Sequence, residues 1–243
     1  SLEMEKLGAE VIRIKGNYER SLKVCKEVSH KNGWKIIQDV AWKNYEDVPR
    51  LTMAGYSVMI KEISGQTKHY ITHVFLQAGV GGMAAGVISG IAKYFKRIPK
   101  IIIVEPKNAN CVMKSLKYGS IKKIIIKKQS IMGGMSCGEV SLVPWRILKN
   151  SVNNCSSVSD KYVAQTITML AKKKFSKKKI IAGECSAPGL ISLIACCNNI
   201  NVKKKLEIDK KSNILVIGCE GDTDKTLYKK LYKLGLEKLK NYD

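Results

Sequence analysis

Apolar residues along the chain recur first at helical and then at strand-like spacing, and the two patterns alternate several times. Leu22, Cys25 and Val28 fall on one side of a helix that is predicted over 18–33. A helix end with a glycine stop at Gly8 is predicted near the start. The other predicted helices are 51–63, 83–95, 109–118, 163–172 and 190–197.

The strand-like segments are short runs of Ile, Val, Leu and Phe that lack polar interruptions. Strands are predicted over 73–77, 101–104 and 214–217, with two shorter ones after Gly8 and over 34–38. Continuous apolar strands that alternate with helices indicate an α/β fold, with a mostly parallel twisted sheet covered by helices on both faces. The region 120–159 has no clear period, and no element is assigned to it.

The chain carries a formal net charge of +23, which raises the question of nucleic-acid binding. Nearly all of this charge is lysine, and the lysine runs are spread over many connecting segments without interleaved aromatic residues. Single-strand binders need such aromatic stacking platforms, and bidentate phosphate contacts need arginine, which is scarce here. We therefore expect no nucleic-acid partner.

Cysteine spacing and hydropathy point to a cytoplasmic protein. No apolar run approaches the roughly 20 residues of a membrane span, and the first residues lack the apolar core of a signal peptide. The eight cysteines form no C-x-x-C pair and have no histidine at ligand spacing. They are expected to be reduced thiols, with no membrane partner, no disulfide and no metal site.

The strongest local signal is the glycine-rich segment 77–86, which follows a predicted strand and opens a predicted helix. Glycines let backbone amides approach an anion, and the helix N-terminus adds positive potential, so the expected ligand is a phosphate. The segment has neither the Walker pattern nor a clean dinucleotide fingerprint. Glu105, at the end of the next strand, could imitate the acid of a dinucleotide site. On the glycines alone, a dinucleotide site and a tight structural turn stay open as alternatives.

Several motifs in chain order resemble those of diaminopropionate ammonia-lyases, a family of fold-type-II pyridoxal-phosphate enzymes. Residues 72–84 resemble the phosphate loop of this family. The other matching segments are 38–46, 49, 55–56, 104–106, 136–139, 183–187 and 220–224. The matches cover nearly the whole chain.

This resemblance implies a homodimer that uses pyridoxal 5′-phosphate to eliminate ammonia from 2,3-diaminopropionate, a small amino acid, and yields pyruvate and a second ammonia. By motif position, the backbone of five residues would hold the cofactor phosphate: Gly79, Val80, Gly81, Gly82 and Met83. The family also implies a small domain, of which 1–50 would be a remnant with the interdomain connection, and a large cofactor-binding domain that 51–243 would cover incompletely.

Two further residues take roles from the same resemblance. Asp39 lies where the family places a carboxylate proposed to move the α-proton of the substrate, and partial burial would raise its pKa toward working pH. The alternative is that Asp39 caps the following turn. Cys219 ends the last strand, where relatives place a neutral donor beside the pyridine nitrogen, which favours elimination over transamination. The alternative is a packed strand cysteine.

Three departures from the family pattern qualify these expectations. Cys185 and Ser186 stand where the family has Ser-Gly, and Cys111 stands where some relatives have a carboxylate metal ligand. The lysine that binds the cofactor covalently lies upstream of Leu2 in the family, so the chain is expected to be truncated and inactive alone. A non-catalytic remnant that binds cofactor or phosphate, and a serine or threonine dehydratase-like eliminase, stay open as alternatives.

Overall fold

The computed structural model describes residues 2–16 and 18–240 and divides into two compact units, Ser1–Gln38 and Asp39–Asp243. The first unit contains α1 (Leu2–Lys6) and α2 (Tyr18–Asn32). Both helices were expected, and Gly33 ends α2 with a positive φ of 65°. The assignment of 1–50 to a small domain and 51–243 to a large one stays a proposal.

The two short strands expected in the first unit do not form. Residues 9–15 and 34–38 have no strand structure, and in the described part of the chain no neighbouring strand pairs with either segment. The prediction was wrong because apolar alternation alone does not hold an extended segment as a strand, which requires inter-strand hydrogen bonds. Trp34 and Ile37 consequently lie exposed.

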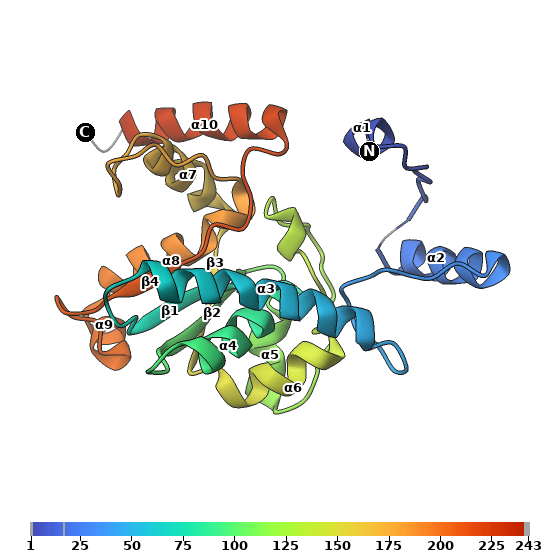
Figure 1. The fold of residues 1–243 in the computed structure, drawn as a ribbon. Helices are drawn as coiled ribbons and strands as arrows, with labels where there is room; N and C mark the ends of the chain where they lie inside the picture. Colours follow the sequence, from blue (N-terminus) through green and yellow to red (C-terminus); the bar gives the residue numbers. More distant parts are fainter. Residues whose placement is uncertain (1, 17, 241–243) are drawn as a thin grey trace. The chain divides into compact units, whose positions relative to one another are not determined.

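The second unit is built on a parallel sheet with the strand order β3-β2-β1-β4 (Figure 1). Its strands are β1 (His73–Gln77), β2 (Lys100–Pro106), β3 (Asn154–Val158) and β4 (Ile214–Val216). Val74 lies opposite Ile101 on one side and Leu215 on the other. The predicted parallel sheet is confirmed, and all four strands end at the same edge.

Helices cover both faces of this sheet, as predicted. Val74 and Leu76 of β1 pack in one core with residues of α3 (Asp47–Gln66), α4 (Gly82–Tyr94), α5 (Cys111–Tyr118) and α6 (Leu142–Ser151). Phe75 points to the other face. It packs with residues of α7 (Val163–Ala171), α8 (Pro188–Cys197), α9 (Ile200–Leu206) and α10 (Lys225–Lys240). The alternation of side chains along β1 therefore supplies two separate cores.

Besides short 3-10 helices, four α-helices and strands of the described chain carried no sequence prediction. Two of them, α6 and β3, fall inside the unassigned region 120–159, and the others are α9 and α10. β3 reads Asn-Cys-Ser-Ser-Val at the edge of the sheet and is only partly buried, so it lacks the apolar run of an inner strand. Figure 1 shows α10 lying against α7.

α4 is held close to α3 by two of its glycines, and this fixes where α4 begins. A Cβ on Gly90 would lie 2.9 Å from Ile60 Cβ and 3.1 Å from Ser57 O. A Cβ on Gly86 would meet the backbone carbonyl of Met53. These contacts allow no side chain, so the two helix backbones pack closely and the loop before α4 has a fixed position.

The most apolar helical segment surrounds α8. The segments Glu184–Cys197 and Ile200–Leu206, bent by 109° to each other, reach the length and composition of a membrane span only as a pair. Within the described residues, no single helix reaches both. Leu190 and Ile191 of α8 are buried in the core of the second unit.

Candidate functional site

The loop between β1 and α4 borders a space that the described residues leave open. Gly81 has φ +95° and ψ 0°, and a Cβ there would lie 2.8 Å from Leu148 Cδ1, so this position requires glycine. Gly82, the first residue of α4, is buried, yet a Cβ on it would have no atom of the described chain within 4 Å. A buried glycine that faces empty space indicates a hollow in front of the loop.

Several backbone amides of the same loop are available to a ligand. The amide of Ala78 donates to Val104 O at 3.0 Å and so belongs to the sheet. Within the described residues, the amides of Gly79, Gly81, Gly82 and Met83 have no hydrogen-bond acceptor. Free amides at a helix N-terminus, in front of a hollow, fit an anionic group such as a phosphate.

The Val80 amide is different, because it points at a thiol. It donates toward Sγ of Cys137, which lies 3.0 Å from the position of a Cβ on Gly79. Burial raises the pKa of Cys137 to about 11, and the Val80 amide lowers it less than burial raises it. A second thiol, Cys111, donates to Gly79 O at 3.6 Å. Both thiols are therefore neutral at pH 7 and flank the start of the loop.

Ser141 joins the segment after Asp39 to the loop between β1 and α4, which we call the glycine loop. Its Oγ accepts a hydrogen bond from the Ala41 amide at 2.8 Å, and its own amide donates to Val80 O at 2.9 Å. Asp39 itself is exposed rather than partly buried. After burial, the charge of Asp39 is the next cause that raises the pKa of Tyr56, a residue of α3. Asp39 thus lies in the electrostatic neighbourhood of the loop. Ser141 was missed from the sequence because the partners of its hydroxyl are far away along the chain.

Cys219 follows β4 beside the glycine loop, because β4 pairs directly with β1. The residue is exposed, but its sulfur is largely shielded, and this desolvation raises the pKa of the thiol. Its Sγ donates to Cys185 O at 3.2 Å. Gln77, at the end of β1, donates from Nε2 to Ile217 O at 2.7 Å, while its buried Oε1 has no donor in the described chain. A neutral thiol and an unpartnered acceptor thus lie at this edge of the sheet.

Glu105 does not act as the acid of a dinucleotide site. Its side chain is fully buried, and its two carboxylate oxygens accept hydrogen bonds from the Val112 and Met113 amides, both at 2.8 Å. These amides open α5, so the carboxyl group caps this helix. Burial raises the pKa of Glu105 to about 7, against the opposing effect of the two amides. Glu105 therefore has a structural role and not the ligand-binding role that its position at the strand end suggested.

Among the described residues, one group of side chains lies close enough together that it could hold a metal ion. Ligand atoms of Glu184, Cys185 and Glu220 lie within 4.8 Å of one another. Glu220 Oε1 already accepts a hydrogen bond from the Cys185 amide, and burial is the first cause that raises the pKa of the Cys185 thiol. Cys185 is also one of the two positions expected to depart from the family pattern.

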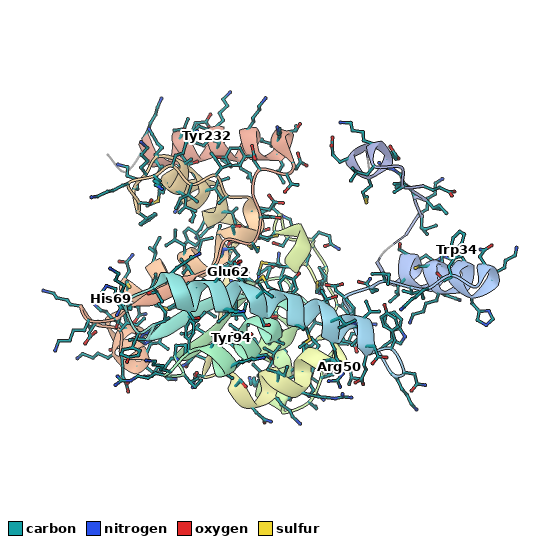
Figure 2. All side chains as sticks on the ribbon, viewed as in Figure 1. Trp34, Arg50, Glu62, His69, Tyr94 and Tyr232 are labelled. Atoms are coloured by element: carbon teal, nitrogen blue, oxygen red, sulfur yellow. The ribbon has the colours of Figure 1, made fainter. Side chains whose placement is uncertain are left out.

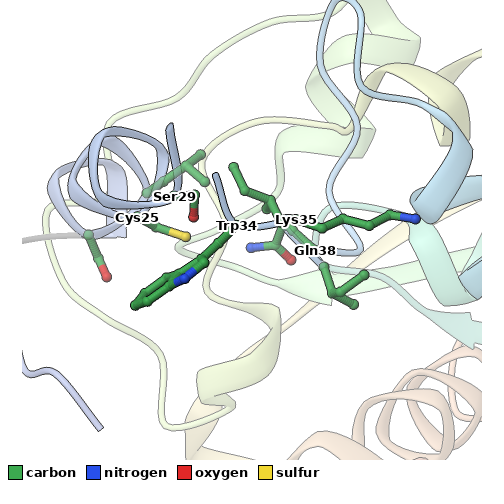
Figure 3. A pocket seen from close by; sticks show the side chains of 9 residues that line it. Cys25, Ser29, Trp34, Lys35 and Gln38 are labelled. Carbon is green, nitrogen blue, oxygen red and sulfur yellow. The ribbon is translucent and has the colours of Figure 1, made fainter. Parts of the chain in front are cut away.

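A separate hollow lies in the first unit and contains none of the predicted site residues. It has a volume of about 290 Å³ and lies between α2 and the segment 34–38 (Figure 3). Cys25, Ser29 and Trp34 are among the side chains that line it. It is distinct from the glycine loop, which belongs to the second unit.

Comparison with known proteins places these features in context. The family model described as "Pyridoxal-phosphate dependent enzyme" matches residues 1–220. Diaminopropionate ammonia-lyase of Escherichia coli (strain K12) is 34% identical over 232 residues, which are 93% of this chain and 58% of that protein. The chloroplastic biosynthetic threonine dehydratase of Arabidopsis thaliana is 28% identical, over 82% of this chain and 32% of the relative.

A solved structure agrees with the sequence comparison. The Escherichia coli diaminopropionate ammonia-lyase in complex with an aminoacrylate-PLP azomethine reaction intermediate superposes with a TM-score of 0.83 at 34% identity. The match covers 93% of this chain and 60% of that one. The fold is therefore that of fold-type-II pyridoxal-phosphate enzymes, and the chain spans about 60% of the length of these diaminopropionate ammonia-lyases.

Proposed function

Because the chain belongs to the family of pyridoxal-phosphate dependent enzymes, we propose that it forms part of a diaminopropionate ammonia-lyase. The proposed reaction is the elimination of ammonia from 2,3-diaminopropionate, with pyruvate and a second ammonia as the final products. The chain spans 58% of the Escherichia coli relative, so the activity is proposed for an enzyme to which these residues contribute the phosphate loop. Pyridoxal phosphate, when bound, supplies the electron sink for this chemistry.

The single observation that carries the proposal is the empty space in front of Gly82. The surrounding amides of Gly79, Gly81 and Met83 are free of acceptors in the described chain, and the positive end of α4 lies at the same place. We propose that these amides bind the cofactor phosphate. The Val80 amide would join them by exchanging the Cys137 thiol for a phosphate oxygen.

Asp39 is proposed to move the proton at Cα of the substrate. Its support is its place after the first unit, its electrostatic influence on Tyr56 and Cys137, and the Ser141 link between Ala41 and the loop. Asp39 is exposed in the structure, so a substrate would have to bind with its Cα within hydrogen-bond reach of this carboxylate.

Cys219 is proposed to face the pyridine nitrogen of the cofactor. Desolvation keeps its thiol neutral, as this role requires. In the structure the thiol donates to Cys185 O, so it must rotate away from that carbonyl before it can donate to the ring nitrogen. A neutral neighbour leaves that nitrogen unprotonated and favours loss of the β-substituent.

A homodimer in the cytoplasm and the division into a small domain over 1–50 and a large domain over 51–243 complete the proposal. Resemblance to the family supports the dimer and the domains. All eight cysteines of the chain are free, which agrees with a reducing compartment.

Binding of pyridoxine 5′-phosphate, measured by calorimetry, tests the proposed loop. This probe has no aldehyde and therefore cannot react with the many lysines. Gly82→Ala should weaken its binding at least tenfold, which corresponds to about 1.4 kcal/mol, because the new methyl group fills the proposed phosphate space. The same change should not lower thermal stability, since alanine is the better helix residue.

Gly65→Ala is the matched control, because Gly65 also lies in a helix with nothing within 4 Å of a Cβ. It should leave binding unchanged. Equal binding by wild type and Gly82→Ala would refute the proposed loop. The loop could bind the probe while an enzyme containing this chain and the cofactor lysine turns over serine faster than diaminopropionate. A dehydratase-like eliminase, as in the threonine dehydratase relative, would then be the better assignment. Binding without any turnover supports a non-catalytic remnant.

A further inference from the structure

A further hollow lies in the second unit, at the end of the sheet opposite to the glycine loop. It has a volume of about 300 Å³ and lies between the segment that follows α3 and the segment that follows α4. These segments lead into the amino-terminal ends of β1 and β2, whereas the glycine loop follows the carboxyl end of β1. The side chains that matter here are Lys68, His69, Tyr70, Tyr94, Lys96 and Arg97. Figure 2 labels His69 and Tyr94.

The described lining of this hollow is basic. Lys68, Lys96 and Arg97 line it, and none of its described lining residues is Asp or Glu. None of these three cations forms an ion pair with a carboxylate in the described part of the chain. Three positive charges around a concave surface favour an anion, because its charge is then neutralised by several donors at once.

Aromatic rings give the hollow a second property. The guanidinium of Arg97 lies over the ring of Tyr70 at 4.6 Å from its centroid. This cation–π contact holds the guanidinium beside the hollow, and its N–H groups are donors that suit a phosphate. Tyr94 and Phe95 add further ring surface. Compensation of the helix dipoles at the ends of α3 and α4 would explain a lysine there, but it would not explain stacked arginine and aromatic side chains together.

We propose that this hollow binds a small aromatic anion of the size of a nucleoside monophosphate. The phosphate would contact Arg97, Lys68 and Lys96, and the base would stack on an aromatic ring. A volume of about 300 Å³ matches the lower end of small-molecule sites. α4 begins at the glycine loop with Gly82 and ends at this hollow with Tyr94, so the two sites are separate and lie at opposite ends of one helix.

Calorimetric titration of the full chain with AMP, and separately with inorganic phosphate, tests this proposal. AMP should bind at least tenfold more tightly than phosphate, because phosphate alone makes no stacking contact. The double variant Lys68→Gln/Lys96→Gln should bind AMP at least tenfold more weakly than wild type. Arg97→Gln should do the same, with the melting temperature unchanged for both.

The matched control is Lys229→Gln/Lys233→Gln, which removes the same charge from the exposed face of α10. It should change AMP affinity less than twofold. An equal loss in this control would show general charge attraction and overturn the site, as would equal affinity for AMP and phosphate or no binding at millimolar AMP. Gly82→Ala should leave AMP binding unchanged, which separates this result from the cofactor proposal.

Discussion

Replacement of Glu105 by glutamine should change how the stability of the protein depends on pH. Glu105 is fully buried, caps α5 and has a pKa raised to about 7 by that burial. The carboxyl group of an unfolded chain titrates near 4.5. Between these values the folded chain holds a proton that the unfolded chain has released, so stability falls as pH rises from about 4.5 to about 7.

The size of this effect follows from the two pKa values. A difference of about 2.5 units corresponds to about 3 kcal/mol, most of which falls between pH 5 and pH 8. Protonated glutamic acid and glutamine both offer one acceptor to the α5 amides, so wild type and Glu105→Gln should be similarly stable at pH 5. At pH 8 the wild type should be less stable than the variant by about 2–3 kcal/mol.

Urea unfolding at pH 5, 6, 7 and 8 measures this difference directly. The gap between the two midpoints should grow by about 1 M over that range. Other titrating groups cancel, because they are common to both proteins. Glu237→Gln, which changes an exposed carboxylate on α10, should show a constant gap from wild type. A pH-independent gap for Glu105→Gln would refute the raised pKa and the sign of its contribution.

Three further substitutions test the loop, the chemistry and the core. Gly81→Ala should lower the free energy of unfolding by about 1–2 kcal/mol or more in urea, because alanine is strained at φ +95°. In an enzyme that contains this chain together with the segment carrying the cofactor lysine, Asp39→Asn should reduce ammonia release from diaminopropionate by a factor of about 100 or more without changing pyridoxine 5′-phosphate affinity, whereas Asp47→Asn should not affect turnover. Gly235→Ala should cost about 1–3 kcal/mol and lower the melting temperature, because its methyl group would clash with the Thr168 hydroxyl.

The inner part of the fold was predictable because its signals are local. β1 and β2 are buried on both faces, so they read as continuous apolar runs, and the predicted strands 73–77 and 101–104 match them closely. β3 was missed because an edge strand with half-buried serines carries no such run. Segment 34–38 shows the opposite error, since an apolar segment without a pairing partner does not become a strand.

The candidate site also has a part that could be predicted from the sequence and a part that could not. The glycine loop was found because its turn, its free amides and its helix start are encoded within a few consecutive residues. The hydrogen bond between Ala41 and Ser141 joins residues 100 positions apart, and no local sequence pattern near either residue indicates it. The unpartnered Gln77 Oε1 likewise depends on how β1, β4 and the segment before α8 meet. Burial also decided the role of Glu105, which the sequence alone left open.

The bridge through Ser141 has a mechanical consequence. One residue is bonded both to Ala41, two positions after Asp39, and to Val80 in the glycine loop. A displacement of either segment would therefore strain a hydrogen bond to the other, so we expect the motions of the carboxylate and the loop to be coupled. Cutting that bridge at the hydroxyl would leave each segment in place on average but would widen the spread of distances between them.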